Sequence, residues 1–257
     1  MSLTDTEQAL YEWQIIAEDF GVEGQGKLKN STVFISRCGG LGGLVAYELA
    51  AAGIGGMVVA HAGDVKHSDL NRQLLMSREG IGKNRMQSIT GRLKELNPDL
   101  ELQGIDQNVG PENVKKLISG VDIIVDCAPL FEERFAMNQR AIELGIPMVE
   151  CSMYECEAHI TSFKPGLTGC LRCLYPEIPP YWTRKFPVFG AVSGMVGCLG
   201  AMEVIKIISG LGRPLFGNLL CCDLKTMSFR KNRIFKDPDC SVCGSVPSIN
   251  QSTKSQA

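Results

Sequence analysis

The stretch STVFISRCGGLGGLVAYELAAAGI, residues 31–54, decides the fold class of this chain. A short β-branched and aromatic run leads through a glycine-rich turn at residues 37–43 into an alanine-rich helix. A strand, a glycine turn and a helix N-terminus in this order form an anion site, because backbone N–H groups and the helix dipole face a phosphate. Tight packing of a helix on a strand also requires glycine, so the turn alone leaves both interpretations open.

The alternation of strand and helix continues along the chain. Short apolar runs predict strands at 56–60, 100–105, 121–127 and 146–151, and helical patterns cover 82–98, 112–119 and 131–145. Beyond residue 154 the segments 155–165 and 226–235 are β-rich and flank a glycine-rich helix at 188–208. The pattern predicts an α/β fold: a Rossmann-like, doubly wound and mainly parallel sheet with a β-rich C-terminal part.

We expect a single domain over residues 1–244. Its nucleotide-binding half covers about residues 1–153 and its β-rich, substrate-binding half about 154–244. The polar segment 245–257 is expected to be a disordered tail.

Composition places the chain among ordinary globular proteins, with 44% hydrophobic and 21% charged residues. A net charge of -2 gives no electrostatic reason to expect nucleic acid or an anionic membrane as a partner. The most membrane-like segment, residues 188–208, contains Glu203 and Lys206, and its uncharged run from Val188 to Met202 is shorter than the ~20 residues of a spanning helix. We interpret it as a buried core helix and expect a cytoplasmic protein, with a membrane span as the alternative.

Eleven cysteines are many for such a chain, and four of them form two pairs. Cys170 and Cys173 stand in CLRC, and Cys240 and Cys243 stand in CSVC. Two C-x-x-C turns allow four thiolates to converge on one tetrahedral zinc ion. We therefore predict a structural zinc site, with redox dithiols or chance spacing as alternatives.

Two cations beyond the glycine turn are candidates for binding phosphates. Arg72 lies in NRQ, and Lys83 follows in GIGKNR. A planar guanidinium and a compact ammonium near a glycine turn suit a triphosphate, although both side chains are equally consistent with a solvated surface.

An ordered set of motifs resembles the MoeB/ThiF/HesA family, the prokaryotic relatives of ubiquitin-activating enzymes. The motifs run from YEWQIIAEDFGVEGQGKLKN through the glycine turn, LNRQLL, IGKNR, IIVDC, CLRC and GCLGAMEVIKIISGLGRPL to CSVCG, over roughly residues 8–244. The resemblance implies a homodimer that uses Mg·ATP to adenylate a carboxylate and releases pyrophosphate. The usual substrate of the family is the C-terminal glycine of a ubiquitin-like sulfur carrier, and some relatives activate peptides or small molecules.

The resemblance also implies a nucleotide site. Arg72 and Lys83 would be catalytic, and Asp126 fits the end of its strand. The positions matching the family's nucleotide-binding residues, together with the residues where its ribose acids would stand, are Gly39, Gly40, Gly42, Ser68, Arg72, Gln73, Lys83, His61 and Asp64.

Several positions depart from the family pattern. The family's acid–x–acid pair, whose first member binds ribose, aligns with His61-Ala62-Gly63, and Asp64 is displaced by one residue. An amide of the phosphate site is Asp69, an acid associated with magnesium is Pro129, and an N-terminal arginine that reaches the partner subunit's nucleotide is Trp13.

The segment between Cys173 and Cys198 contains no cysteine, so a thioester step from this crossover loop is excluded. His61 could still donate to a ribose, or it could be an ordinary strand-end residue. Asp64 or Asp126 could hold magnesium by another route.

Three functional hypotheses follow from these residues. The first is an adenylyltransferase with an altered nucleotide site that acts on a carrier-protein or other carboxylate. The second is a non-catalytic homologue that binds or scaffolds a ubiquitin-like or peptide partner. The third, an NAD-linked oxidoreductase, fits the fold but lacks an acid at the end of the second strand.

Overall fold

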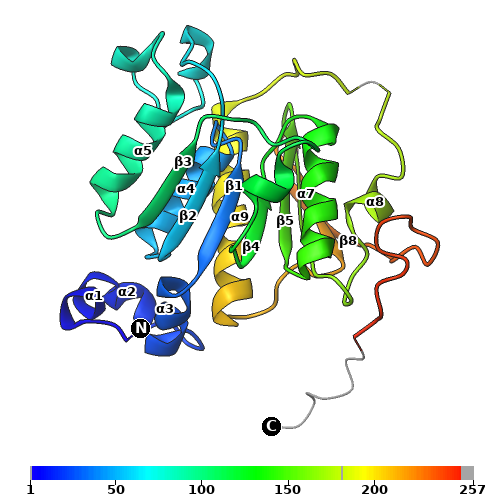
Figure 1. Cartoon of the computed structure of the whole chain (residues 1–257), viewed down its shortest axis with the longest axis horizontal. Coiled ribbons are helices and arrows are strands. Elements are labelled where there is room, and N and C mark those ends of the chain that lie inside the picture. The colour runs from blue at the N-terminus through cyan, green and yellow to red at the C-terminus, as the bar shows by residue number, and fades with distance from the viewer. Residues whose placement is uncertain (1, 181, 250–257) are drawn as a thin grey trace.

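A computed structural model describes residues 2–180 and 182–249. One sheet runs through the whole molecule (Figure 1). The strands of the described residues are β1 Thr32–Ser36, β2 Gly56–Ala60, β3 Glu101–Ile105, β4 Ile123–Asp126, β5 Met148–Tyr154, β6 Glu157–Phe163, β7 Asn218–Asp223 and β8 Ser228–Arg233. The helices are α1 Asp5–Leu10, α2 Glu12–Ile15, α3 Gly21–Lys29, α4 Gly42–Ala51, α5 Arg85–Leu96, α6 Val114–Leu117, α7 Phe131–Leu144, α8 Leu171–Leu174 and α9 Gly190–Ser209, with short 3-10 turns at His67–Asp69 and Arg78–Gly80.

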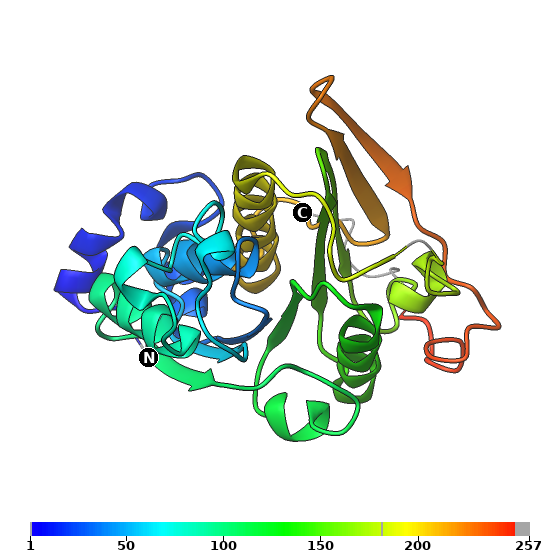
Figure 2. The same cartoon turned by 90° about the horizontal axis from the view of Figure 1, so that it is seen from above.

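The strands follow the order β3-β2-β1-β4-β5-β6-β7-β8. Strands β1 to β5 pair in parallel, and β6, β7 and β8 are added in antiparallel orientation. The β7–β8 hairpin extends away from the helices at one end of the sheet (Figure 2). The predicted fold class, a mainly parallel Rossmann-like sheet with a β-rich C-terminal part, is confirmed.

Two apolar cores cover the two faces of the sheet, as the doubly wound arrangement requires. Val33 and Ile35 of β1 belong to the core that includes α3, α4, α5 and α9, whereas Phe34 belongs to the core with α6 and α7. Because β1 is buried on both faces, its sequence is a continuous apolar run without alternation.

Helix α9 is the one helix within the described residues that is long and apolar enough to cross a membrane. Its glycines allow close approach to α4, since a Cβ on Gly197 would lie 2.6 Å from the Cβ of Leu44 and 2.8 Å from the carbonyl oxygen of Leu41. The helix also contacts α3, β5 and β6. This packing is that of a core helix in a globular domain.

The expected disordered tail begins with ordered residues. Ile249 donates its backbone N–H to the carbonyl oxygen of Gly166, and the carbonyl of Val246 accepts from Lys236. The rest of that tail, residues 250–257, lies outside the described residues.

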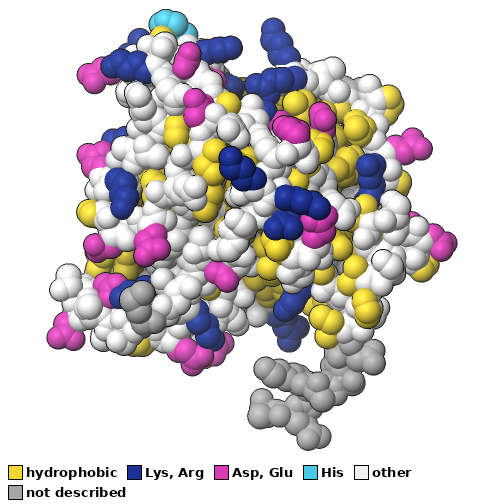
Figure 3. Space-filling model, viewed as in Figure 1, with side chains coloured by type: hydrophobic (Ala, Val, Ile, Leu, Met, Phe, Trp, Pro, Cys, Tyr) yellow, Lys and Arg dark blue, Asp and Glu magenta, His cyan; other side chains and the backbone are white. Residues whose placement is uncertain are grey.

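Charges of both signs are mixed on the surface. On the face seen in Figure 3, Lys and Arg side chains are interspersed with Asp and Glu side chains. That face therefore presents no broad field of one sign.

Candidate active site

A cavity of about 460 Å³ opens at the carboxyl ends of β1, β2 and β4 and continues beneath the segment 182–188. Ligands of open α/β sheets bind at this edge, because parallel strands end there together. Seven of its lining side chains are cationic, and one is a carboxylate, Asp69. The cations are Arg37, Lys66, Arg72, Arg85, Arg134, Arg184 and Lys185.

The glycine turn forms one wall of this cavity. Gly39 and Gly40 line it, and a Cβ on Gly40 would approach the Arg72 side chain to 3.0 Å. Gly42 is not among the lining residues, and a Cβ on it would lie 2.8 Å from the carbonyl oxygen of Arg37. Gly42 therefore permits α4 to pack on β1, while Gly39 and Gly40 leave room for a ligand.

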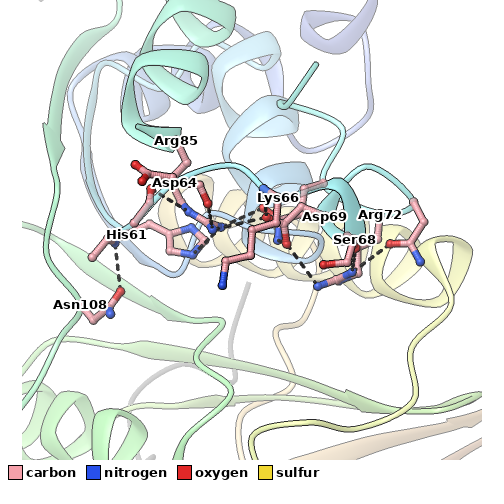
Figure 4. Close-up of polar contacts among 12 residues, drawn as sticks. His61, Asp64, Lys66, Ser68, Asp69, Arg72, Arg85 and Asn108 are labelled. Atoms are coloured by element: carbon pink, nitrogen blue, oxygen red, sulfur yellow. Dashed lines mark hydrogen bonds and ion pairs between the residues drawn. The ribbon is translucent and has the colours of Figure 1, made fainter. Parts of the chain in front are cut away.

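Arg85, the first residue of α5, connects the segments around the cavity (Figure 4). Its buried guanidinium donates to the carbonyl oxygens of Gly63 and Asp64 at 3.2 and 2.7 Å and to Gln73 Oε1 at 3.1 Å. A fourth contact joins it to Asp69 Oδ2 at 3.4 Å. The guanidinium fixes the loop after β2 against the start of α5.

His61, at the end of β2, is 6% exposed and lines the cavity. Its Nε2 lies 3.2 Å from Arg85 Nη1. Because a guanidinium can only donate, Nε2 accepts and Nδ1 carries the ring proton, and Nδ1 has no hydrogen-bond partner among the described residues. Burial, followed by the charges of Arg85 and Arg37, lowers the pKa of His61 to about 3, so the ring is neutral at physiological pH.

Comparison with known proteins accounts for this arrangement. The profile of the ThiF family matches residues 11–242. The chain belongs to the ThiF family. It is 43% identical over 244 residues to the vegetative HesA protein of Trichormus variabilis (strain ATCC 29413 / PCC 7937), and this match covers 95% of the chain and 92% of that protein.

A second relative is longer than this ThiF-family chain. The adenylyltransferase and sulfurtransferase MOCS3 of Drosophila sechellia is 36% identical over 254 residues, and the match covers 97% of the chain but 56% of MOCS3. Among solved structures, E. coli MccB superimposes with a TM-score of 0.83 at 25% identity, covering 96% of this chain and 75% of MccB. MccB bound to ATP superimposes with a TM-score of 0.79 at 28% identity, over 87% of the chain and 69% of MccB.

The structure brings six of the nine residues predicted for the nucleotide site to the cavity: Gly39, Gly40, His61, Ser68, Arg72 and Gln73. It does not bring Gly42, Lys83 or Asp64 there. Lys83 is exposed in the turn before α5, and Asp64 is exposed and contributes only its carbonyl oxygen to Arg85. Neither side chain lines the cavity, and their contact with a nucleotide stays a prediction.

The sequence analysis did not predict five cations of the cavity: Lys66, Arg85, Arg134, Arg184 and Lys185. Arg85 could have been found from the motif IGKNR, because Asn84 caps α5 and Arg85 is therefore the first residue of the helix. Lys66, on the loop after β2, lines the cavity and forms no ion pair within the described residues (Figure 4). Arg184 and Lys185 come from the segment before α9, which no motif connected with the nucleotide site.

Arg37 occupies the place of the first glycine in a dinucleotide fingerprint, with a left-handed φ of 54°. Its guanidinium contacts Glu133 through Nε and Nη2 at 2.7 and 2.5 Å. This bidentate pair ties the end of β1 to α7 and neutralises the charge of Arg37. The net positive charge at the cavity therefore comes from the other lining cations.

Asp126, at the end of β4, lies beneath the cavity and is fully buried. Arg134 stands 3.3 Å from Asp126 Oδ2 and donates to Glu150 Oε1 at 2.6 Å. Burial raises the pKa of Asp126 to about 7; the charge of Arg134 opposes this, and that of Glu150 adds to it. One guanidinium thus serves two buried carboxyl groups.

These acids do not form a magnesium site. Magnesium requires several oxygen ligands in octahedral geometry. Asp69 is the one carboxylate among the lining residues described, and it contacts Arg72 and Arg85. Pro129 stands at the position of the expected acid and uses its carbonyl oxygen to accept the Trp182 indole N–H at 2.6 Å. The residues present do not fit a protein-held magnesium ion.

The four paired cysteines meet at α8, which packs against α7. Their sulfurs all lie within 4.8 Å of one another. Cys170 and Cys240 are 3.8 Å apart, and Cys173 and Cys243 are 3.4 Å apart. Four sulfurs at ~2.3 Å from a tetrahedral zinc ion stand about 3.8 Å apart, so this cluster could hold zinc. Such an ion would join α8 to the segment after β8.

Proposed function

We propose that this protein adenylates a carboxylate with ATP, the carboxylate being the C-terminus of a ubiquitin-like carrier or another polypeptide. In this reaction a carboxylate oxygen attacks the α-phosphorus, an acyl-adenylate forms and pyrophosphate leaves. The names and ligands of the relatives support the proposal, since MOCS3 is an adenylyltransferase and MccB has been solved with ATP and with MccA.

The observation that carries the proposal is the cationic cavity at the glycine turn. A triphosphate placed against Gly39 and Gly40 lies within reach of Arg72 and Lys66. It also lies within reach of Arg184 and Lys185 in the segment 182–188, which we call the strap segment. As pyrophosphate leaves, negative charge accumulates on its oxygens, and fixed cations stabilise that charge. Arg72 is held ready by its contacts with the Ser68 carbonyl at 2.6 Å and the Asn71 side chain at 2.9 Å.

At the end of β2, His61 would contact the ribose in a different way from the acid that the family pattern has at this position. A carboxylate accepts hydrogen bonds from ribose hydroxyls, whereas the neutral Nδ1–H of His61 donates to a ribose oxygen. Nδ1 has no hydrogen-bond partner among the described residues, but it is buried, so this contact requires the neighbouring side chains to move when the nucleotide binds. Arg85 behaves as a positioning residue here, because it holds His61 and Gln73 and is itself buried.

A non-catalytic role as a partner-binding homologue is the second candidate. It is favoured by the shortage of carboxylates in the cavity: among the described lining residues Asp69 is the one carboxylate, and it already contacts two arginines. Such a protein would bind its partner without turning over ATP.

ATP–pyrophosphate exchange separates the two candidates. The full chain is incubated with Mg·ATP, labelled pyrophosphate and a panel of carboxylates that includes a carrier ending in Gly-Gly. Carboxylate-dependent exchange that is lost in Arg72→Ala supports the adenylyltransferase. Calorimetry with no ATP binding at millimolar concentration would exclude it and leave the partner-binding role.

A further inference from the structure

A second cavity, of about 200 Å³, adjoins the cationic one. The two share Arg134, Ser152, Met153 and Trp182, so their walls are continuous. We call the second cavity the aromatic chamber. It is too small for a nucleotide, since pockets for drug-sized ligands measure about 300–1,000 Å³.

Four of the ten residues that line the chamber are Phe, Tyr or Trp: Phe131, Tyr154, Tyr175 and Trp182. Phe131 meets Tyr175 and Trp182 edge to face, with ring centroids 5.1 and 5.6 Å apart. Trp182 also packs near Tyr154 at 6.3 Å. Rings that served only to fasten the strap segment to the sheet would fill the space between them, but here a cavity remains. Apolar walls of this kind favour an apolar group over water.

The chamber leads outward to a third, polar cavity of about 280 Å³, with which it shares Glu157 and His159. This outer cavity lies over the antiparallel strands, where His159 of β6 is paired with Cys221 of β7. Its other lining residues are Cys222, Asp223, Ser228, Arg230 and Asn232. The side chains that line this cavity include both hydrogen-bond donors and acceptors, which suit the peptide groups of an extended chain.

The order of the three cavities defines the shape of a ligand. A carboxylate would stand at the junction beside Ser152 and Arg134, facing the site where the α-phosphate of ATP is proposed to lie. A side chain on the terminal or next-to-last residue would then enter the aromatic chamber, and the preceding chain would cross the polar cavity. A Gly-Gly terminus would leave the chamber unfilled.

We propose that the substrate is a polypeptide whose last or next-to-last residue is aromatic or large and aliphatic, and that the aromatic chamber binds this side chain. The inference rests on the proposed adenylation and narrows its substrate class. Removing a large apolar side chain from water favours its binding about ten- to a hundredfold over glycine.

The chain offers a direct reporter for this proposal. It contains two tryptophans, Trp13 and Trp182, and Trp13 is 84% exposed on α2. In a Trp13→Phe protein the emission of Trp182 alone is followed during titration with N-acetyl-Phe-Gly, N-acetyl-Gly-Phe and N-acetyl-Gly-Gly. We expect one of the two aromatic peptides to shift the emission and to bind at least tenfold more tightly than the glycine peptide.

A matched pair of variants assigns the effect to the chamber. Tyr154→Ala should reduce the preference for the aromatic peptide at least threefold, whereas Phe229→Ala should leave it unchanged. Tyr154 is 44% exposed and lines the chamber, and Phe229 is 49% exposed on β8, outside all three cavities. Both substitutions are on the surface, so neither is expected to prevent folding.

The outcomes separate this inference from the proposed function. Pyrophosphate exchange driven equally well by N-acetyl-Gly-Gly and by the aromatic peptides would overturn the chamber proposal and leave adenylation standing. If aromatic peptides bind at Trp182 but the protein does not bind ATP, the chamber proposal is supported and the proposed adenylation activity is excluded. No response of Trp182 to either aromatic peptide would overturn the chamber directly.

Discussion

The Nη1 of Arg85 lies 3.2 Å from Nε2 of His61, and this contact determines which way the imidazole proton points. The donor of the pair is the guanidinium, so the ring proton is on Nδ1, which is buried and has no hydrogen-bond partner among the described residues. The residue at the end of β2 is thus a hydrogen-bond donor, where the family pattern has an acid that accepts.

Replacement of Arg85 should weaken ATP binding about ten- to a hundredfold, the effect of losing charge-assisted contacts and the order they maintain. Lys83→Ala, two residues away and outside the cavity, is the matched control and should change the affinity less than threefold. Calorimetry with Arg85→Ala, Arg85→Lys and Lys83→Ala measures this, with thermal unfolding to confirm that each protein is folded. A large loss in Lys83→Ala alone would contradict the geometry.

His61 should make the protein less stable in acid. Its pKa is about 3 in the folded chain and about 6.5 when unfolded, so the unfolded state binds the proton first as pH falls. Stability associated with His61 is complete above pH 6.5 and decreases by about 1.4 kcal/mol per pH unit down to about pH 3. Because the contribution of Asp126 has the opposite sign over this range, urea unfolding of His61→Asn should show a stability that falls as pH rises from 4 to 6.

Asp126 should have the opposite effect. Its pKa is raised to about 7 in the folded protein from 3.8, so the folded state holds the proton more tightly. The corresponding stability is present below pH 3.8 and is lost as pH rises to about 7, again by about 1.4 kcal/mol per unit. Because the two slopes oppose each other between about pH 4 and 6.5, the native protein should show a flat profile there. Asp126→Asn should then become more stable with rising pH, and an unchanged flat profile would refute the assignment.

Purified protein should contain about one zinc ion per chain. Cys173→Ser removes one sulfur of the cluster and should release the metal and lower the melting temperature, since structural zinc contributes folding energy. Cys198→Ser is the matched control, because Cys198 is exposed on α9 and outside the cluster. Metal analysis of both proteins decides the matter, and freshly prepared, reduced protein without zinc would rule out the site.

We expect the homodimer implied by the family to use the exposed side of α9. Met202 on that side is 40% exposed, and Met202→Arg should convert a dimer to a monomer. Met227→Arg, at the tip of the β7–β8 hairpin where the side chain is 68% exposed, should leave the mass unchanged. Light scattering that gives 28.0 kDa for the native protein at all concentrations would count against a dimer.

The fold was predictable because it is encoded locally. The apolar run at 32–36, the glycine turn and the periodicity of residues 85–96 each specify an element without help from distant segments. The order in which β6, β7 and β8 join the sheet is not encoded in this way, since antiparallel pairing depends on contacts between remote strands. Composition indicated only that this part would be β-rich.

Site residues could be predicted from the sequence where a motif coincides with the end of a strand. They could not be predicted where the backbone geometry determines which side chain faces the cavity. Gly63 has a φ of 94°, so an acid placed there to restore the family's pair would be strained. Lys83 and Arg85 are both cations of one short motif, and the start of α5 determines which of them faces inward. The aromatic chamber assembles from residues 131, 154, 175 and 182, which no local pattern connects.

The sequence positions of the four cysteines determine when the cluster can form during synthesis on the ribosome. Cys173 and Cys243 are 70 residues apart, so at about 5–20 residues per second the second sulfur pair is made about 4–14 seconds after the first. During that interval the parallel strands β1 to β5 have already been synthesised. Cys170 and Cys173 are then present without the other two ligands, Cys240 and Cys243. Binding of a zinc ion by all four sulfurs would therefore be a late event of biogenesis, and a nascent chain stalled before Cys240 would expose two reduced thiols to oxidation.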